Sequence, residues 1–294
     1  MKRVIINLKY IAKLATHWTS GIFALLGLVC TFVSLSDMLN SELPFGRRLL
    51  MSGIILISVW MVSFIGCAIY ISIRRRYEIM ELNGGHHVYV QYGDLFSKKE
   101  VQDPQKRRNI VVATNRCFDT LIDNDLIATD SLHGVAMKKL YAAGVFNERT
   151  LYTKIQQNLA LQQLQAETLD RSVKRKGNLE RYPVGSVAEV KVNDTCSYFF
   201  LGLTVLDHEL KASVSDQDYV TALMKLLKFC NTRSQQLPVV IPLIGGGLAR
   251  TGKDERQILE FIIQFIKFHK DLINCDIHIV VRESGKNRIS ITNL

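Results

Sequence analysis

The chain has 294 residues and a formal net charge of +10, and its length allows one or two domains. The charge does not indicate a nucleic-acid partner. Nine lysines and arginines against two acidic residues fall within residues 1–76, where they flank apolar segments as in membrane proteins. The six cysteines are scattered and form no Cys-x-x-Cys pair. They therefore indicate core thiols of a reducing compartment, and no metal site is predicted.

Two uncharged apolar segments, residues 18–36 and 49–73, are predicted to be transmembrane helices. A helix needs about 20 apolar residues to cross the hydrocarbon core, so the second segment is long enough and the first is close to the minimum. A cleaved signal peptide is the alternative for the first segment. It is disfavoured because no small-residue cleavage site is present and a second span follows at once.

The short loop between these segments makes them a helical hairpin with several small residues that favour close helix packing. Seven basic residues lie on the side of the chain termini and two, Arg47 and Arg48, lie in the loop. The positive-inside rule therefore places both termini in the cytoplasm, with the hairpin in the plasma membrane. We expect the hairpin over residues 1–76, a linker over 77–85 and a soluble domain over 86–294.

The soluble part alternates strand-like apolar runs with helical ones. Such alternation predicts a three-layer α/β domain with ligand loops at the carboxyl ends of its strands. Strands are expected over residues 87–92, 109–115, 187–192, 197–205, 239–244 and 276–281. Helices are expected from residue 135 onward and over 151–171, 218–231 and 258–266.

The most informative unit is the strand, glycine loop and helix that begins at Val239. Gly245, Gly246 and Gly247 allow a backbone to come close to a ligand, and the N–H groups at a helix start attract phosphate. The alternative is a tight turn that only joins the strand to the helix, because three glycines are less specific than a Walker motif.

Four short motifs in the soluble part, in this order, resemble those of a macrodomain, the α/β module that binds ADP-ribose. They are Gly93-Asp94-Leu95, Val111-Val112-Ala113-Thr114-Asn115, Tyr182-Pro183-Val184-Gly185 and the segment from Ile241 to Leu248. The resemblance covers residues 86–285 and implies a mixed sheet. It also implies that Asp94 receives the adenine and that the glycine loop binds phosphate.

Two further motifs, with the membrane helices ahead of them, resemble the macrodomain effectors of Thoeris antiphage systems. They are Phe118-Asp119-Thr120 with Asp123, and Ser131-Leu132-His133-Gly134. The resemblance implies a bacterial partner, a TIR-domain enzyme that consumes NAD and makes an ADP-ribose-derived messenger such as histidine-linked ADP-ribose. It also implies that binding triggers oligomerisation, membrane disruption and cell death.

Two departures from the family pattern bear on catalysis. Ser131 to Gly134 stand where ordinary macrodomains have a glycine run, and Ala249 stands where the hydrolase branch has a catalytic aspartate. Without that carboxylate the group that attacks or activates at the ribose is missing. We therefore expect a binding protein and not an enzyme. A membrane-tethered ADP-ribosyl hydrolase and a scaffold without ligand are the alternatives.

Each candidate residue has an alternative structural role. Asn115 either binds ribose hydroxyls or caps its loop, and His133 either contacts the distal group of the ligand or only begins a helix. Asp119 and Asp123 either meet a cationic group of the messenger or form a polar loop. Arg250 either pairs with phosphate or lies in solvent. The candidate ligand-binding residues are Gly93, Asp94, Leu95, Asn115, Asp123, Leu132, His133, Gly134, Gly245, Gly246, Gly247, Leu248 and Arg250.

Overall fold

The structure, a computed structural model, describes residues 2–30, 44–246, 252–292 and 294. The chain divides into two compact units. One unit holds Met1–Arg75 together with Lys286–Leu294, and the other holds Arg76–Gly285. The expected boundaries differ from these at two places, because the C-terminal tail belongs to the helical unit and the sheet unit begins at Arg76.

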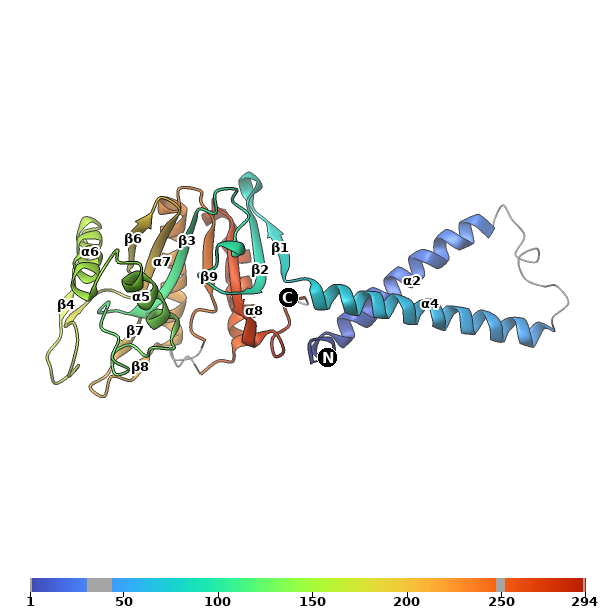
Figure 1. Cartoon of the computed structure of the whole chain (residues 1–294), viewed down its shortest axis with the longest axis horizontal. Coiled ribbons are helices and arrows are strands. Elements are labelled where there is room, and N and C mark those ends of the chain that lie inside the picture. The colour runs from blue at the N-terminus through green and yellow to red at the C-terminus, as the bar shows by residue number, and fades with distance from the viewer. Residues whose placement is uncertain (1, 31–43, 247–251, 293) are drawn as a thin grey trace. The chain divides into compact units, whose positions relative to one another are not determined.

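The helical unit contains α1 (Lys2–Ile6), α2 (Leu8–Cys30) and α4 (Phe45–Ile73) (Figure 1). Two segments, Leu8–Cys30 and Gly46–Ile73, are long and apolar enough to cross a membrane. Most of their large apolar side chains are exposed in the isolated chain, for example Val62 at 70%, as lipid contact requires. The first span begins earlier than the sequence predicts, and its expected end at residues 31–36 lies outside the described residues.

The hairpin is held together at the end where α4 finishes. Ile11 and Ala15 of α2 pack against Ile71 and its neighbours on α4. The buried Arg3 donates hydrogen bonds to the carbonyl oxygens of Ser72, at 2.6 Å, and of Arg74. A cation there is stabilised because the last carbonyls of a helix have no partner within it and carry partial negative charge.

The C-terminal tail is fastened to the start of the same helical unit. Asn7 is buried, and its side-chain oxygen accepts hydrogen bonds from the hydroxyls of Ser290, at 2.5 Å, and Thr292, at 2.6 Å. Ile289 and Ile291 are buried as well. Their burial gives the tail an apolar anchor, which explains why residues 286–294 group with the helices and not with the domain that precedes them.

The second unit is built on an eight-stranded mixed sheet (Figure 1). Its strand order is β1-β2-β10-β9-β3-β7-β6, with β8 paired to β7. The strands from β2 to β7 in this order run parallel, whereas β1, β6 and β8 are antiparallel to their neighbours. The bounds are β1 (Arg76–Glu81), β2 (His87–Gly93), β3 (Arg108–Asn115), β6 (Val187–Asn193), β7 (Cys196–Leu206), β8 (Ala212–Ser213), β9 (Val239–Pro242) and β10 (Ile277–Arg282).

Helices cover both faces of this sheet, so the expected three-layer α/β domain with a mixed sheet is confirmed (Figure 1). On one face, Met137 and Ile155 pack in one core with Phe200 of β7. The adjacent Phe199 points to the other face, where its ring meets that of Phe229 at 5.1 Å. The first face carries α5 (Leu132–Ala142) and α6 (Glu148–Leu161), and the second carries α7 (Asp216–Arg233) and α8 (Glu255–Phe268).

Several expected elements differ in extent. Residues 76–81 form β1, an edge strand, where most of the range was expected to be linker. The helix expected over 151–171 ends at Leu161, because Gln163 takes a left-handed φ of 56° and a two-stranded sheet follows. That small sheet consists of β4 (Glu167–Thr168) and β5 (Glu180–Arg181).

Candidate functional site

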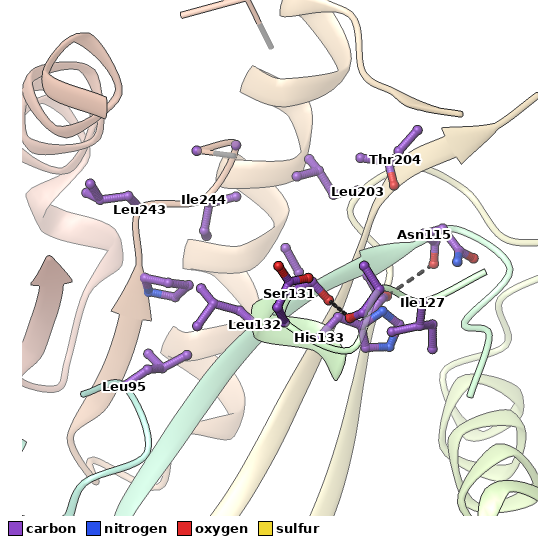
Figure 2. Close-up of a pocket in the computed structure, with 18 of the residues that line it drawn as sticks. Leu95, Asn115, Ile127, Ser131, Leu132, His133, Leu203, Thr204, Leu243 and Ile244 are labelled. Carbon is purple, nitrogen blue, oxygen red and sulfur yellow. Dashed lines mark hydrogen bonds between the residues drawn. The ribbon is translucent and has the colours of Figure 1, made fainter. Parts of the chain in front are cut away.

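A cavity of about 300 Å³ lies at the carboxyl ends of the central parallel strands (Figure 2). In open α/β sheets this edge is where ligands bind, because strand-to-helix loops converge there. Its wall is formed by residues 113–115 at the end of β3, the loop 126–133 that leads into α5, parts of β7, the loop 242–246 after β9, and two residues of β10.

The cavity brings together about half of the residues that the sequence singled out. Those that line it are Leu95, Asn115, Leu132, His133, Gly245 and Gly246. Asp94 and Gly134 are not among the lining residues but are next to them in the chain, and neither Gly93 nor Asp123 lines the cavity. Gly247, Leu248 and Arg250 lie outside the described residues, as does Ala249.

Asn115 ends β3 and is almost fully buried. Its side-chain oxygen accepts a hydrogen bond from the backbone N–H of Cys117 at 3.0 Å, so the loop-capping role is present. Its side-chain nitrogen makes no hydrogen bond within the described part of the chain. The residue therefore caps the loop with one end and offers a donor to the cavity that it lines.

The Ser131-to-Gly134 motif forms the start of α5. Ser131 is the N-cap, and its hydroxyl accepts from the N–H of Gly134 at 2.9 Å. A Cβ on Gly134 would lie 2.2 Å from the carbonyl oxygen of Ala128, so only glycine lets the helix start this close to the loop. The first turn of α5 contains no acidic residue, and its free N–H groups suit an anion.

His133 lies in the first turn of α5 and lines the cavity (Figure 2). Its Nε2 atom is buried and has no hydrogen-bond partner among the described residues. Burial lowers the pKa of this imidazole to about 4, because a desolvated site disfavours the charged form. The ring is therefore neutral near pH 7 and presents a donor and an acceptor to a ligand.

The loop after β9 is a fixed turn over the residues that are described. Gly245 takes a φ of +89°, which a residue with a side chain rarely adopts. The carbonyl oxygen of Ile244 accepts from the hydroxyl of Tyr219 at 2.7 Å, which ties the loop to α7. Residues 242–246 thus form a tight turn, and the same turn also forms part of the cavity wall.

The sequence suggested that the start of the helix after the glycine loop, α8, would bind phosphate. The start of α5 suits an anion better than the start of α8. Asp254 caps α8 and accepts from the N–H of Gln257, while the Gln257 side chain accepts from the N–H of Asp254. Glu255, in the first turn, lines the cavity. Since two carboxylates already occupy this helix start, the start of α5 is the more favourable place for a phosphate.

The carboxylates of the 119–123 loop are paired with lysines, which speaks against a role in binding a cationic ligand group. Asp119 and Lys174 form a buried ion pair at 2.6 Å, and Asp123 pairs with Lys176 at 2.6 Å. Neither aspartate lines the cavity. The sequence could not show this, because both lysines lie some fifty residues further along the chain.

Several residues that line the cavity were not predicted from the sequence. Arg282 is the last residue of β10, Thr204 lies on β7, and Asp130 and Glu255 are the acidic residues of the described cavity wall. The rule that ligands bind beyond the carboxyl ends of strands points to Arg282. No group of three or more metal-ligating side chains occurs among the described residues.

Comparisons with known proteins agree on one family. The family described as Thoeris protein ThsA, Macro domain, matches residues 88–282. A curated relative, Thoeris protein ThsA of Bacillus amyloliquefaciens (strain Y2), is 27% identical over 171 residues, which are 58% of this chain and 52% of that protein. The match thus spans about half the length of the relative.

Among solved structures, similar chains include an Oceanobacillus iheyensis macrodomain variant with ADPR, at 12% identity and a TM-score of 0.44, covering 72% of this chain and 92% of that one. The Oceanobacillus iheyensis macrodomain with ADP has 11% identity and a TM-score of 0.44, covering 73% and 92%. The family match extends over more than half of the sequence. The chain therefore belongs to the family of Thoeris protein ThsA macrodomains.

Proposed function

We propose that this chain is a membrane-anchored receptor whose macrodomain binds an ADP-ribose derivative in antiphage defence. The observation that carries the proposal is the cavity at the strand carboxyl ends, in a chain of the ThsA macrodomain family. One wall is the start of α5, whose first turn has no acidic residue although Asp130 precedes its N-cap, and another is a glycine turn. These two features suit a diphosphate, which needs N–H donors and close backbone approach.

We infer the orientation of the ligand from the chemistry of the lining residues. Leu95, directly after Asp94, marks the adenine end, and the diphosphate lies between the start of α5 and Gly246. The distal ribose reaches the side-chain nitrogen of Asn115 at the end of β3. His133, neutral near pH 7, is positioned to contact the group attached beyond that ribose.

The output is proposed to be a membrane response to a messenger that a partner TIR-domain enzyme makes from NAD. Two apolar helices precede the domain, and two helices cannot enclose a pore. Several copies must therefore assemble if the membrane is to be opened, and the ligand must bind the assembled arrangement more tightly to drive that change. We expect no turnover of the ligand. Release of free ADP-ribose from an ADP-ribosylated substrate would favour the tethered hydrolase instead.

Calorimetric titration of the full-length protein in detergent with ADP-ribose tests the proposal. We expect saturable binding that Gly246→Glu abolishes, because the new carboxylate would repel the diphosphate. Gly246→Ala is the steric control, because it adds the same tight Cβ contact as glutamate, 3.2 Å from the carbonyl oxygen of Leu243, but no charge. Leu161→Glu, at a side chain that is 81% exposed on α6, is the charge control. Equal binding by all four proteins would show that the ligand site lies elsewhere.

A further inference from the structure

We propose that Glu100 positions the adenine-receiving turn and connects it, through Gln91, to Arg76 at the start of the sheet unit. This inference rests on the proposed function, because it concerns how Asp94 would recognise adenine. Glu100 belongs to a short 3-10 turn, Lys98–Glu100, that follows β2. Its side chain is buried although it carries a carboxylate. Burial of a carboxylate is unfavourable unless the group is well hydrogen-bonded, and Glu100 has such hydrogen bonds.

The carboxylate of Glu100 packs directly beneath the turn. Its Oε1 accepts from the backbone N–H of Asp94 at 3.2 Å, and its Oε2 accepts from the side-chain nitrogen of Gln91 at 2.7 Å. A Cβ on Gly93 would lie 2.3 Å from Oε1. Glycine at this position is therefore explained by the carboxylate below it, and a residue with a side chain would push Glu100 away from Asp94.

Among the other polar atoms of Asp94, two accept hydrogen bonds from described residues and one, Oδ2, does not. Its Oδ1 accepts from the N–H of Phe96 at 3.1 Å, and its carbonyl oxygen accepts from the N–H of Ser97 at 2.9 Å. Oδ2 makes no hydrogen bond with any described residue, and the side chain is exposed. This oxygen is the acceptor left for the exocyclic amine of adenine, and Glu100 fixes the backbone from which it projects.

The same carboxylate determines how Gln91 is oriented. Because Glu100 accepts only, the Gln91 amide must turn its NH₂ toward it and its oxygen toward Arg76. The Arg76 Nε donates to that oxygen at 2.5 Å, and its Nη2 donates to the carbonyl oxygen of Glu100 at 2.7 Å. Arg76 opens β1, shortly after α4 ends at Ile73. The adenine turn and the chain leaving the membrane helix are thus joined by one directional network.

Glu100→Gln tests the network because it replaces one acceptor oxygen of the carboxylate by a donor NH₂ group. The new NH₂ group would face a donor, either the N–H of Asp94 or the amide of Gln91, so the turn would lose its anchor. We expect the full-length protein to bind ADP-ribose about tenfold more weakly. Binding of the hypoxanthine analogue, which lacks the exocyclic amine, should hardly change. The loss of preference between these two probes is a result that general destabilisation would not produce.

The double variant Gln91→Glu/Glu100→Gln is the matched rescue. It moves the carboxylate to position 91, where one oxygen accepts from Arg76 and the other from the new amide, whose oxygen is then free for the N–H of Asp94. The Gln91 side-chain nitrogen also donates to the Glu100 carbonyl oxygen at 2.8 Å, and this one bond is lost in the double variant, so affinity should recover less fully than the preference between the probes. We expect the preference for ADP-ribose to return. Hydrogen exchange then tests the connection to Arg76. Saturating ADP-ribose should slow exchange of residues 76–81 at least threefold in the wild type and in the double variant, but not in Glu100→Gln.

The outcomes separate this inference from the proposed function. A wild-type protein that does not bind ADP-ribose overturns the proposed function. If the wild type binds and Asp94→Ala loses the preference for adenine while Glu100→Gln keeps it, only the positioning role is wrong. The positioning role is also wrong if the double variant is folded but does not recover. Unchanged exchange of residues 76–81 on ligand binding contradicts the connection to Arg76.

Discussion

The ion pair between Lys174 and Asp119 is the most deeply buried charged contact among the described residues, at 0% and 1% exposure. Asp119 also accepts from the N–H of Asn178 at 2.7 Å, and Lys174 donates to the Asn178 carbonyl oxygen at 2.6 Å. Gly177, with a φ of +82°, has no room for a Cβ beside Asp119. This pair therefore fastens the segment after β4 to the loop that follows β3.

Removing one partner of this pair should destabilise the domain strongly. Lys174→Met leaves the Asp119 carboxylate buried without its cation, which costs about 3–5 kcal/mol. The control is Lys191→Met, whose partner Asp194 is 98% exposed, and which should cost far less because water screens an exposed ion pair. Urea unfolding followed by circular dichroism measures both. Equal midpoints for the two variants would show that the buried pair contributes no more than a surface pair.

The two buried imidazoles make stability depend on pH. Burial lowers the pKa of His133 to about 4 and, together with the Arg76 charge, that of His278 to about 3. Between pH 3 or 4 and about pH 6.5, the unfolded chain binds more protons at these two histidines than the folded chain does. The free energy of unfolding is therefore not reduced by them above pH 6.5 and falls as the pH drops below that value. His133→Gln should reduce the loss between pH 6.5 and 4.5 by about half. An unchanged pH dependence of the unfolding free energy would contradict this.

At the scale of single elements, the start of α5 is the proposed phosphate site. His133→Glu adds a carboxylate to a first turn that has none, and this side chain lines the cavity. The variant should bind ADP-ribose at least tenfold more weakly than the neutral His133→Gln, because the carboxylate cancels the attraction of the helix start for phosphate. Calorimetry measures both affinities, and thermal unfolding checks that both variants are folded. Equal affinities of the two folded variants would mean that α5 does not hold the phosphates.

The elements also show what the sequence could predict and what it could not. The runs around 109–115 and 239–242 were recognised because buried parallel strands are continuous and apolar. Arg76–Glu81 was taken mostly as linker, since an edge strand with an exposed side mixes polar and apolar residues. In the site, Asn115 and the glycine turn are marked by local sequence. The partners of Asp119 and the packing of Glu100 on Gly93 depend on chain segments brought together only by folding.

At the scale of the whole molecule, the helical unit contains three parts of the chain that should lie on one side of the membrane. Arg3 binds carbonyl oxygens at the end of α4, and Asn7 binds the tail through Ser290 and Thr292. We expect all three in the cytoplasm, as the distribution of basic residues predicts. A reporter that is active only outside the cytoplasm, fused after Leu294, should be silent, whereas one inserted in the loop between α2 and α4 should be active. The reverse pattern would refute this topology.

In the proposed function, ligand-driven assembly is the step that would connect binding to a membrane response. A Cβ added at Gly21, Gly27, Gly53 or Gly66 would meet no described atom within 4 Å. These four glycines are therefore not used in packing among the described residues of one hairpin, and we expect helices of other copies to pack on them, since helices pack closely where side chains are small. We expect ADP-ribose, or the natural derivative, to increase the mass of the full-length protein in detergent, measured by light scattering.

Gly53→Leu together with Gly66→Leu should block this increase without changing ligand affinity, because the added side chains have space in a single hairpin but not between helices of adjacent copies. At ligand concentrations that saturate the wild type, Asp94→Ala should not assemble for a different reason, because the loss of its contact with the exocyclic amine weakens binding. A wild-type mass that is the same with and without saturating ligand would rule out ligand-driven assembly. Liposome leakage assays would then test whether a preformed oligomer opens the membrane when the ligand changes its arrangement.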